Sequence, residues 1–455
     1  RRTAVGVQLM TMFGSQWLAN AGADYEISQS IRFNADDSAF LTRTPGSEGD
    51  RRTFTLSTWV KFNEIRADNI VFSSWISSGA SSYALLYMHS DFRVRFENDG
   101  TTKLKPSMLF RDTSAWYHIV LRVDTTDSTA NDRYQMYVNG VRQTDLEEND
   151  QPAQDFQTNV NKTQPHYLGR NGYSLAMIYS DLYQAETYFI DGTALTASSF
   201  GETNDDGVWI PKKYSGAFGT QGFYLKGQDS SALGDDTSGN GNDFTSSGLA
   251  AADQMSDTPT NNHCTYNPLR IRGTNTLSDG NLQAAAGSAG AYVTSTFGVS
   301  SGKWYWEYTF TGTYNFPIVG IMGTALYQDA YPSQLTNAVL YYSSNGNKYI
   351  DSTSSSYGAS YAVSDKIGVA LNLDDNEITF FKNNSTQGAI SISNREYTPL
   401  AGEEGSVNGG IIANFGQSDF EYTPPTGFKA LNTANLPTPT IKDGSAYFQT
   451  ALYTG

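Results

Sequence analysis

The sequence predicts an all-β protein, and three observations lead to this expectation. Short segments that alternate apolar and polar residues recur about every ten residues from Ser28 to Phe420, with Gly, Asn, Asp and Ser between them. Long patterns with helical periodicity are nearly absent. The chain also contains 29 Tyr and 42 Gly residues, which suit half-exposed strands and tight turns. Its 455 residues are enough for about two to four domains.

The first half of the chain contains the clearest strand and hairpin patterns. Residues 116–123 predict a half-buried strand, because alternate side chains point to one face: Tyr117, Ile119, Leu121 and Val123. Residues 134–138 are followed by Asn139-Gly140, which tolerates positive φ and predicts a type I′ hairpin. We expect the same kind of turn at Asp191-Gly192, after the apolar residues 188–190.

Two segments depart from this strand pattern. Residues 196–202 begin with a capping threonine and predict one short helix. Between residues 227 and 281, Gly, Asn, Asp, Ser and Thr dominate and no long strand is expected. This change of composition predicts a domain boundary.

Strand patterns resume in the second half of the chain. The expected strands there are 292–297, 303–310, 366–373 and 377–382. The residues Asp374-Asp375-Asn376 predict a hairpin turn between the last two strands.

Charge and cysteine content exclude several classes of function. The formal net charge of −16 disfavours binding to nucleic acid and to anionic membrane surfaces. The single cysteine, Cys264, can form no disulfide within the chain and no thiolate zinc site. No apolar run of 18 residues is present, so we expect no membrane insertion.

Motifs for catalysis are also missing. Glycoside hydrolysis needs two carboxylates beside the scissile bond, and no Glu-x-Asp-x-Glu triplet occurs in the chain. Residues 298–302 match Gly-x-Ser-x-Gly, but a strand pattern follows them where that motif needs a helix. We therefore expect no enzymatic activity. A hydrolase that assembles its carboxylates from separate strands is the alternative.

Residues 236–241, Asp-Thr-Ser-Gly-Asn-Gly, resemble the first half of a calcium-binding loop. Oxygen-bearing side chains stand at the first, third and fifth positions and glycine stands at the sixth, but the twelfth residue is Ser247, where such loops have glutamate. A weak calcium site and a plain hydrogen-bonded turn are both open interpretations. The candidate ligands are Asp236, Ser238, Asn240 and Asp243. No other cofactor is expected.

Aromatic residues in polar loops are the candidate ligand-binding residues. The stretches around them are rich in Gly, Ser and Asn, as in antibody loops, where tyrosine supplies rigid contact area. Packing within the loops is the alternative role. The candidates are Tyr314, Phe316, Tyr327, Tyr331, Tyr357 and Tyr361.

Two groups of segments resemble known modules. Residues 28–226 are similar to a laminin-G-like, concanavalin A-like domain, through the segments 30–34, 53–60, 116–120 and 136–140. Residues 285–428 resemble a SPRY domain, through the segments 301–307, 319–321, 365–371, 378–383 and 413–416. Both resemblances imply antiparallel β-sandwiches of the jelly-roll kind, and the second implies that loops at one end of the sandwich bind partners.

The resemblances divide the chain into five parts. These are an N-terminal strap (1–27), the first sandwich (28–226), a Gly/Asn/Ser-rich linker with the calcium-like loop (227–284), the second sandwich (285–428) and a C-terminal tail (429–455). The strap is a candidate for docking to a larger particle, and burial on the first sandwich is the alternative.

The segments 235–244, 259–261, 267–268 and 424–431 further resemble laminin-G/SPRY proteins of marine tailed phages. This resemblance implies a protein of the virion surface, such as a tail fibre, spike or capsid appendage. It implies binding to a host surface glycan or receptor, contact with other virion proteins, and a homo-oligomer such as a trimer. The alternative is a structural decoration or cement protein that recognises only proteins.

Overall fold

The computed structural model describes residues 25–63, 68–75, 82–173, 176–312, 316–325, 327–405 and 409–437. Throughout these ranges the chain is built from strands, as the sequence predicts. The helices there are single 3-10 turns, and none of them is long and apolar enough to cross a membrane. These turns are η2 (Ala130–Asp132), η3 (Ala197–Ser199), η4 (Ala251–Asp253), η5 (Pro332–Gln334) and η6 (Thr433–Asn435).

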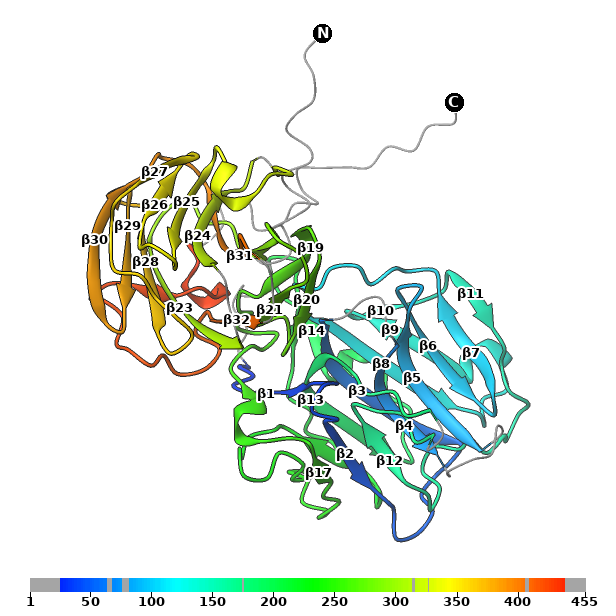
Figure 1. Ribbon diagram of the computed structural model, residues 1–455. Coiled ribbons are helices and arrows are strands. Elements are labelled where there is room, and N and C mark those ends of the chain that lie inside the picture. The colour runs from blue at the N-terminus through cyan, green and yellow to red at the C-terminus, as the bar shows by residue number, and fades with distance from the viewer. Residues whose placement is uncertain are drawn as a thin grey trace. The chain divides into compact units, whose positions relative to one another are not determined.

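The chain forms two compact domains, and the first ends at Asn262. One of its antiparallel sheets contains β1 (Ser30–Phe33), β3 (Thr53–Phe62), β8 (Tyr117–Asp124), β9 (Tyr134–Val138), β10 (Val141–Arg142), β13 (Leu182–Asp191), β16 (Phe223–Leu225) and β18 (Gln254–Met255). The strand order is β10-β9-β8-β3-β13-β1-β18, and β16 pairs with β13. Figure 1 labels the strands from β10 to β1.

The other sheet of the first domain is also antiparallel. Its strands are β2 (Phe40–Arg43), β4 (Asn69–Trp75), β5 (Tyr83–His89), β6 (Arg93–Asn98), β7 (Thr101–Pro106), β11 (Leu146–Asn149), β12 (His166–Leu168) and β17 (Thr245–Ser247). They follow the order β11-β7-β6-β5-β4-β12-β2-β17. A separate pair consists of β14 (Gly201–Thr203) and β15 (Trp209–Pro211).

Alternating side chains of the two sheets form one shared core. The predicted face of β8 is confirmed, because all four of its expected apolar residues lie in this core. Leu56 and Val60 of β3 meet Leu86 of β5 and Val71 of β4 there. Burial of apolar area between the sheets is the main stabilising contribution in such a sandwich.

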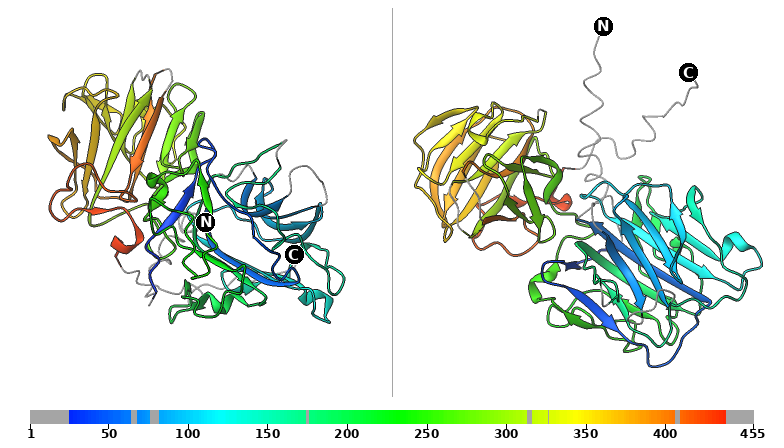
Figure 2. Two further views of the ribbon diagram at one scale, coloured as in Figure 1. Left: turned by 90° about the horizontal axis from the view of Figure 1, so that it is seen from below. Right: turned by 45° about the vertical axis from the view of Figure 1, so that its right-hand side comes forward.

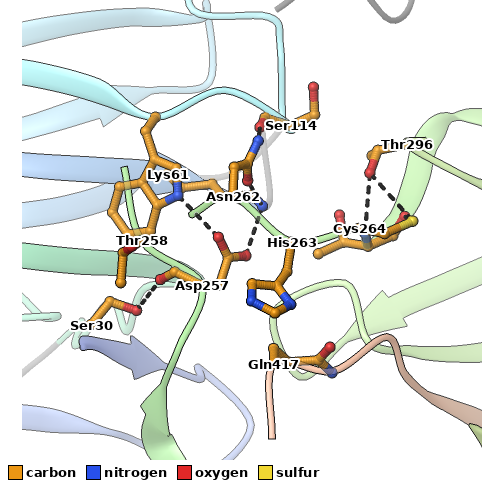
Figure 3. A network of polar contacts seen from close by, with 12 residues as sticks. Ser30, Lys61, Ser114, Asp257, Thr258, Asn262, His263, Cys264, Thr296 and Gln417 are labelled. Carbon is orange, nitrogen blue, oxygen red and sulfur yellow. Dashed lines mark hydrogen bonds and ion pairs between the residues drawn. The ribbon is translucent and has the colours of Figure 1, made fainter. Parts of the chain in front are cut away.

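The structure divides the expected linker between the two domains. β17 extends one sheet of the first domain and β18 extends the other. Two buried ion pairs hold the second part of this segment on the first domain. Arg32 Nη2 lies 2.9 Å from Asp253 Oδ1. Lys61 Nζ lies 2.8 Å from Asp257 Oδ2 (Figure 3). Apolar contacts attach it as well, because Leu233 and Phe244 lie in the shared core and Met255 packs beside Trp59.

The second domain begins at His263 and is a second antiparallel sandwich (Figure 2). One sheet contains β19 (Tyr266–Arg272), β22 (Tyr292–Ser295), β24 (Pro317–Gly323), β25 (Ala338–Tyr342), β26 (Lys348–Ile350), β27 (Thr353–Ser355) and β31 (Tyr397–Glu403). Its strand order is β19-β22-β31-β24-β25-β26-β27.

The facing sheet contains β20 (Asn275–Ser278), β21 (Gln283–Ala286), β23 (Lys303–Gly312), β28 (Lys366–Asn372), β29 (Glu377–Lys382), β30 (Ser385–Ser391), β32 (Gly409–Asn414) and β33 (Lys429–Ala430). Its strand order is β20-β21-β32-β23-β28-β29-β30, and β33 pairs with β23 in parallel. The rings of Tyr341 on β25 and Phe380 on β29 lie 5.3 Å apart, which shows that the two sheets pack face to face. The four strands expected in this half of the chain are confirmed.

The turn predictions have mixed outcomes. Asn139 and Gly140 have φ of 46° and 80° and join β9 to β10, as predicted. The prediction of a hairpin at Asp191-Gly192 is wrong. β13 pairs with β1, β3 and β16, and the chain continues from Gly192 to η3 without a returning strand. The Asp191 carboxylate instead accepts hydrogen bonds from Asp50 N at 2.7 Å and Gln221 N at 2.9 Å. The helix expected over 196–202 is only the single turn η3.

The predicted N-terminal strap and C-terminal tail fall almost wholly outside the described residues. Of the strap, only residues 25–27 are described, and Ile27 packs in the first domain beside Trp59 and Met255. Of the tail, residues 429–437 are described, and β33 pairs with β23 of the second domain.

Candidate binding sites

The loop predicted to hold calcium is closed by its own hydrogen bonds. Asp236 Oδ1 accepts the amide hydrogens of Tyr224 and Ser238, each at 2.8 Å. Asp236 Oδ2 accepts from Ser238 Oγ at 2.8 Å and from the amide of Asn242 at 2.9 Å. These four donors use the acceptor capacity of the carboxylate. In the described ranges, no group of three His, Cys, Asp or Glu side chains is placed to hold a metal ion.

The other predicted ligands also serve the loop. Asn240 Nδ2 donates to the carbonyl oxygens of Gly219 at 2.8 Å and Gly222 at 2.9 Å. Asp243 Oδ1 accepts the Asp236 amide at 2.8 Å. The geometry therefore fits the hydrogen-bonded turn that the sequence left open as the second interpretation.

Replacing Asp236 with asparagine is expected to lower the free energy of unfolding of the first domain by about 1 to 2 kcal/mol, because an amide can accept fewer of the four hydrogen bonds. Thermal unfolding with calcium and with a chelator should give the same loss. Asp235→Asn is the matched control, since Asp235 is exposed and next in sequence. A wild-type protein that unfolds more easily with the chelator would contradict this interpretation.

An open polar pocket lies beside this loop. It has a volume of about 490 Å³ and is lined by Thr42, Arg43, Thr44, Gly46, Gly241, Asn242, Asp243 and Thr245. Burial lowers the pKa of the Arg43 guanidinium, while Asp236, Asp191 and Asp243 oppose this shift. Sequence analysis missed the pocket because β2 and the 241–245 segment are far apart in the chain.

In the second domain, the loop between β24 and β25 covers one face of a sheet. Leu335 of this loop is buried against Ile318, Met322 and Leu400. This anchor leaves Tyr327 and Tyr331 on the outer side of the loop, with 49% and 38% of their surfaces exposed. The structure thus brings two of the predicted binding residues together.

Arg272 at the end of β19 holds this loop in place. Its guanidinium lies over the Tyr331 ring, 4.6 Å from the centroid. It also donates to Asp329 Oδ1 at 3.1 Å and to the carbonyl oxygen of Gly290 at 2.7 Å. Gly290 has φ of +70°, and a Cβ there would stand only 2.5 Å from the Tyr331 ring. Tyr331 is therefore presented in a fixed orientation.

Phe316, with an exposed fraction of 44%, is connected to the same loop through Glu404. The amide of Glu404 donates to the carbonyl oxygen of Phe316 at 3.2 Å. The Glu404 carboxylate accepts hydrogen bonds from the hydroxyls of Ser333 and Tyr342. We call the exposed residues Phe316, Tyr327 and Tyr331 the aromatic loop surface.

The other predicted residues do not belong to the aromatic loop surface. Tyr361 is only 5% exposed, and its hydroxyl donates to the carbonyl oxygens of Pro317 and Tyr341, so its assignment to a ligand surface is corrected to a role in packing. Tyr357 is half-buried and packs on Tyr341, with ring centroids 5.4 Å apart. Tyr314 lies outside the described residues.

A buried glutamate in the first domain had no sequence signal. Glu186 stands at a bulge in β13 with φ of +51°. Its Oε2 accepts hydrogen bonds from Tyr25 at 2.9 Å, Tyr188 at 2.6 Å and Tyr224 at 2.5 Å. Burial and Glu186 raise the pKa of Tyr25 to about 12. Because the carboxylate is enclosed by donors, we assign it a structural role.

Family comparisons match each of the two sandwiches to a known module. Residues 34–178 match the concanavalin A-like lectin/glucanases superfamily, and residues 303–400 match the SPRY domain. The chain therefore contains one domain of each kind.

Solved structures similar to this chain include SPRY domains. The human HERC1 SPRY domain is 20% identical with a TM-score of 0.29, and the match covers 32% of this chain and 96% of that one. The TRIM65 PSpry domain is 14% identical with a TM-score of 0.29, over 33% of this chain and 92% of that one. No curated protein sequence matches this chain.

Proposed function

We propose that this chain is a non-catalytic protein of a virion surface that binds host surface glycans through the aromatic loop surface of its SPRY domain. The observation that carries the proposal is the exposure of three large aromatic side chains, of which Tyr331 is held by Arg272 and Tyr327 by a hydrogen bond to the carbonyl oxygen of Ile271. Rigid, exposed aromatic rings can stack on sugar faces at a low cost in conformational entropy.

Two further points support this proposal. Two buried carboxylates of the first domain, Glu186 and Asp257, are surrounded by hydrogen-bond donors, so we assign them structural roles. The placement on a virion rests on the resemblance of the segments 235–244 and 424–431 to phage proteins. Weak binding at each site would be strengthened by several copies on one particle.

Replacing Tyr331 with alanine is expected to weaken adsorption of the full chain to its host polysaccharide about tenfold, because an exposed aromatic anchor is lost. The measurement is binding of the labelled chain to an array of bacterial envelope polysaccharides. Val363→Ala is the matched control, since Val363 is in the same domain and is also 38% exposed. The proposal fails if the wild-type chain binds no envelope fraction.

A further inference from the structure

The polar pocket of the first domain is built from groups that are held rigidly. Arg43 Nη2 donates to Gln221 Oε1 at 2.7 Å and to Asn242 Oδ1. Asn242 Nδ2 in turn donates to the carbonyl oxygens of Thr220 at 3.0 Å and Gly222 at 2.7 Å. Both walls of the pocket are therefore fixed before any ligand arrives, which reduces the entropy cost of binding.

Several polar groups of the pocket keep unused hydrogen-bonding capacity. Among the described residues, no hydrogen bond is made by Arg43 Nε and Nη1, by the second carboxylate oxygen of Asp243, or by the hydroxyls of Thr42, Thr44 and Thr245. None of these atoms belongs to the buried unpaired polar atoms of the structure, so solvent reaches them. The pocket thus offers donors and acceptors together.

The charges around the pocket restrict the ligand. The carboxylates of Asp191, Asp236 and Asp243 favour the charged form of Arg43, so negative charge surrounds the guanidinium. The chain as a whole has a net charge of −16, which opposes an anionic ligand. Every lining residue is polar or glycine, which gives an apolar ligand nothing to pack against.

We infer that this pocket binds an uncharged saccharide through adjacent hydroxyl groups. A sugar hydroxyl can accept a hydrogen bond from Arg43 and donate one to Asp243, while the threonine hydroxyls do either. The volume of about 490 Å³ is within the range of small-ligand sites and exceeds that of one sugar ring. This inference deepens the proposed function by adding a second glycan site in the other domain.

The test uses the full chain with the neutral disaccharides maltose, lactose and cellobiose, and with glucuronic acid as the charged comparison, measured by saturation-transfer NMR and calorimetry. We expect a neutral disaccharide to bind and glucuronic acid to bind at least tenfold more weakly. Gly46→Leu should weaken binding at least tenfold, because Gly46 lines the pocket and a larger side chain there takes up space that the ligand needs. No atom lies within 4 Å of the Gly46 Cβ position, so the leucine should not disturb the fold. Thr203→Val, on exposed β14, is the control and should bind as wild type.

The outcomes separate this inference from the proposed function. Tighter binding of glucuronic acid would overturn the ligand class, and an unchanged affinity in Gly46→Leu, or no binding by the wild type, would overturn the site. Tyr331→Ala should leave disaccharide binding in the pocket unchanged. If Tyr331→Ala loses polysaccharide adsorption, the aromatic loop surface is supported. If Gly46→Leu keeps both polysaccharide adsorption and disaccharide binding, the pocket is refuted.

Discussion

Replacing Asp257 with asparagine is expected to lower the free energy of unfolding of the first domain by about 3 to 5 kcal/mol, because it leaves a buried ammonium group without its counter-ion. Asp257 pairs with Lys61, and the two side chains are 1% and 0% exposed. Asp257 Oδ1 also accepts the indole hydrogen of Trp116 at 3.0 Å. Denaturant unfolding followed by tryptophan fluorescence measures the loss.

A double replacement separates the charge from the contacts. In Lys61→Met/Asp257→Leu both charges are absent, so most of the lost stability should return. Asn262 would still tie the segment to the domain through Ser114, since its Nδ2 donates to the Ser114 carbonyl oxygen at 2.7 Å (Figure 3). Asp155→Asn, at an exposed carboxylate, is the control and should cost little. A double variant as unstable as Asp257→Asn would show that packing, and not charge, sets the cost.

Features that depend on near neighbours in the chain could be predicted from the sequence. The strand at 116–123 and the turn at Asn139-Gly140 are confirmed because alternation and positive φ are local properties. The same turn signal failed at Asp191-Gly192, where Asp191 bonds to Gln221 and Asp50, far away in sequence. Local patterns therefore fail where long-range polar contacts decide the path of the chain.

The sites were harder to predict for the same reason. Tyr331 and Tyr361 occur in similar polar stretches, yet one is exposed and the other is enclosed between Tyr341 and Phe310. Composition does not distinguish them, because burial depends on strands that lie elsewhere in the chain. The sequence indicated only one side of the Arg43 pocket. The Asp236 loop has a recognisable motif, whereas nothing in the sequence marked β2 as its neighbour.

The linker shows this limit most clearly. Its polar composition indicated a separate segment, because it has few apolar residues to bury. In the structure, Asp253 forms an ion pair with Arg32 and Asp257 forms one with Lys61, each about 200 positions earlier in the chain. The stability of Asp257→Asn therefore also tests whether this part of the predicted linker belongs to the first domain.

Glu403 of the second domain should make that domain less stable as pH rises from about 4.5 to about 7. Burial raises the pKa of this carboxyl from 4.5 to about 7, and its Oε2 has no hydrogen-bond partner among the described residues. Between these values the unfolded chain releases the proton while the folded domain keeps it, so stability falls by about 1.4 kcal/mol per pH unit. Below pH 4.5 both states are protonated, and above pH 7 the cost stays constant at about 3 kcal/mol.

The variant Glu403→Gln carries no charge and should escape this cost. Denaturant unfolding at pH 8 should find it more stable than wild type by about 3 kcal/mol, and the difference should vanish near pH 4.5. Glu377→Gln on β29 is the control, because the Glu377 side chain is half-exposed and its effect should be small at both pH values. An equal difference at both pH values would mean that the amide changes packing and that the carboxyl is not the group that titrates.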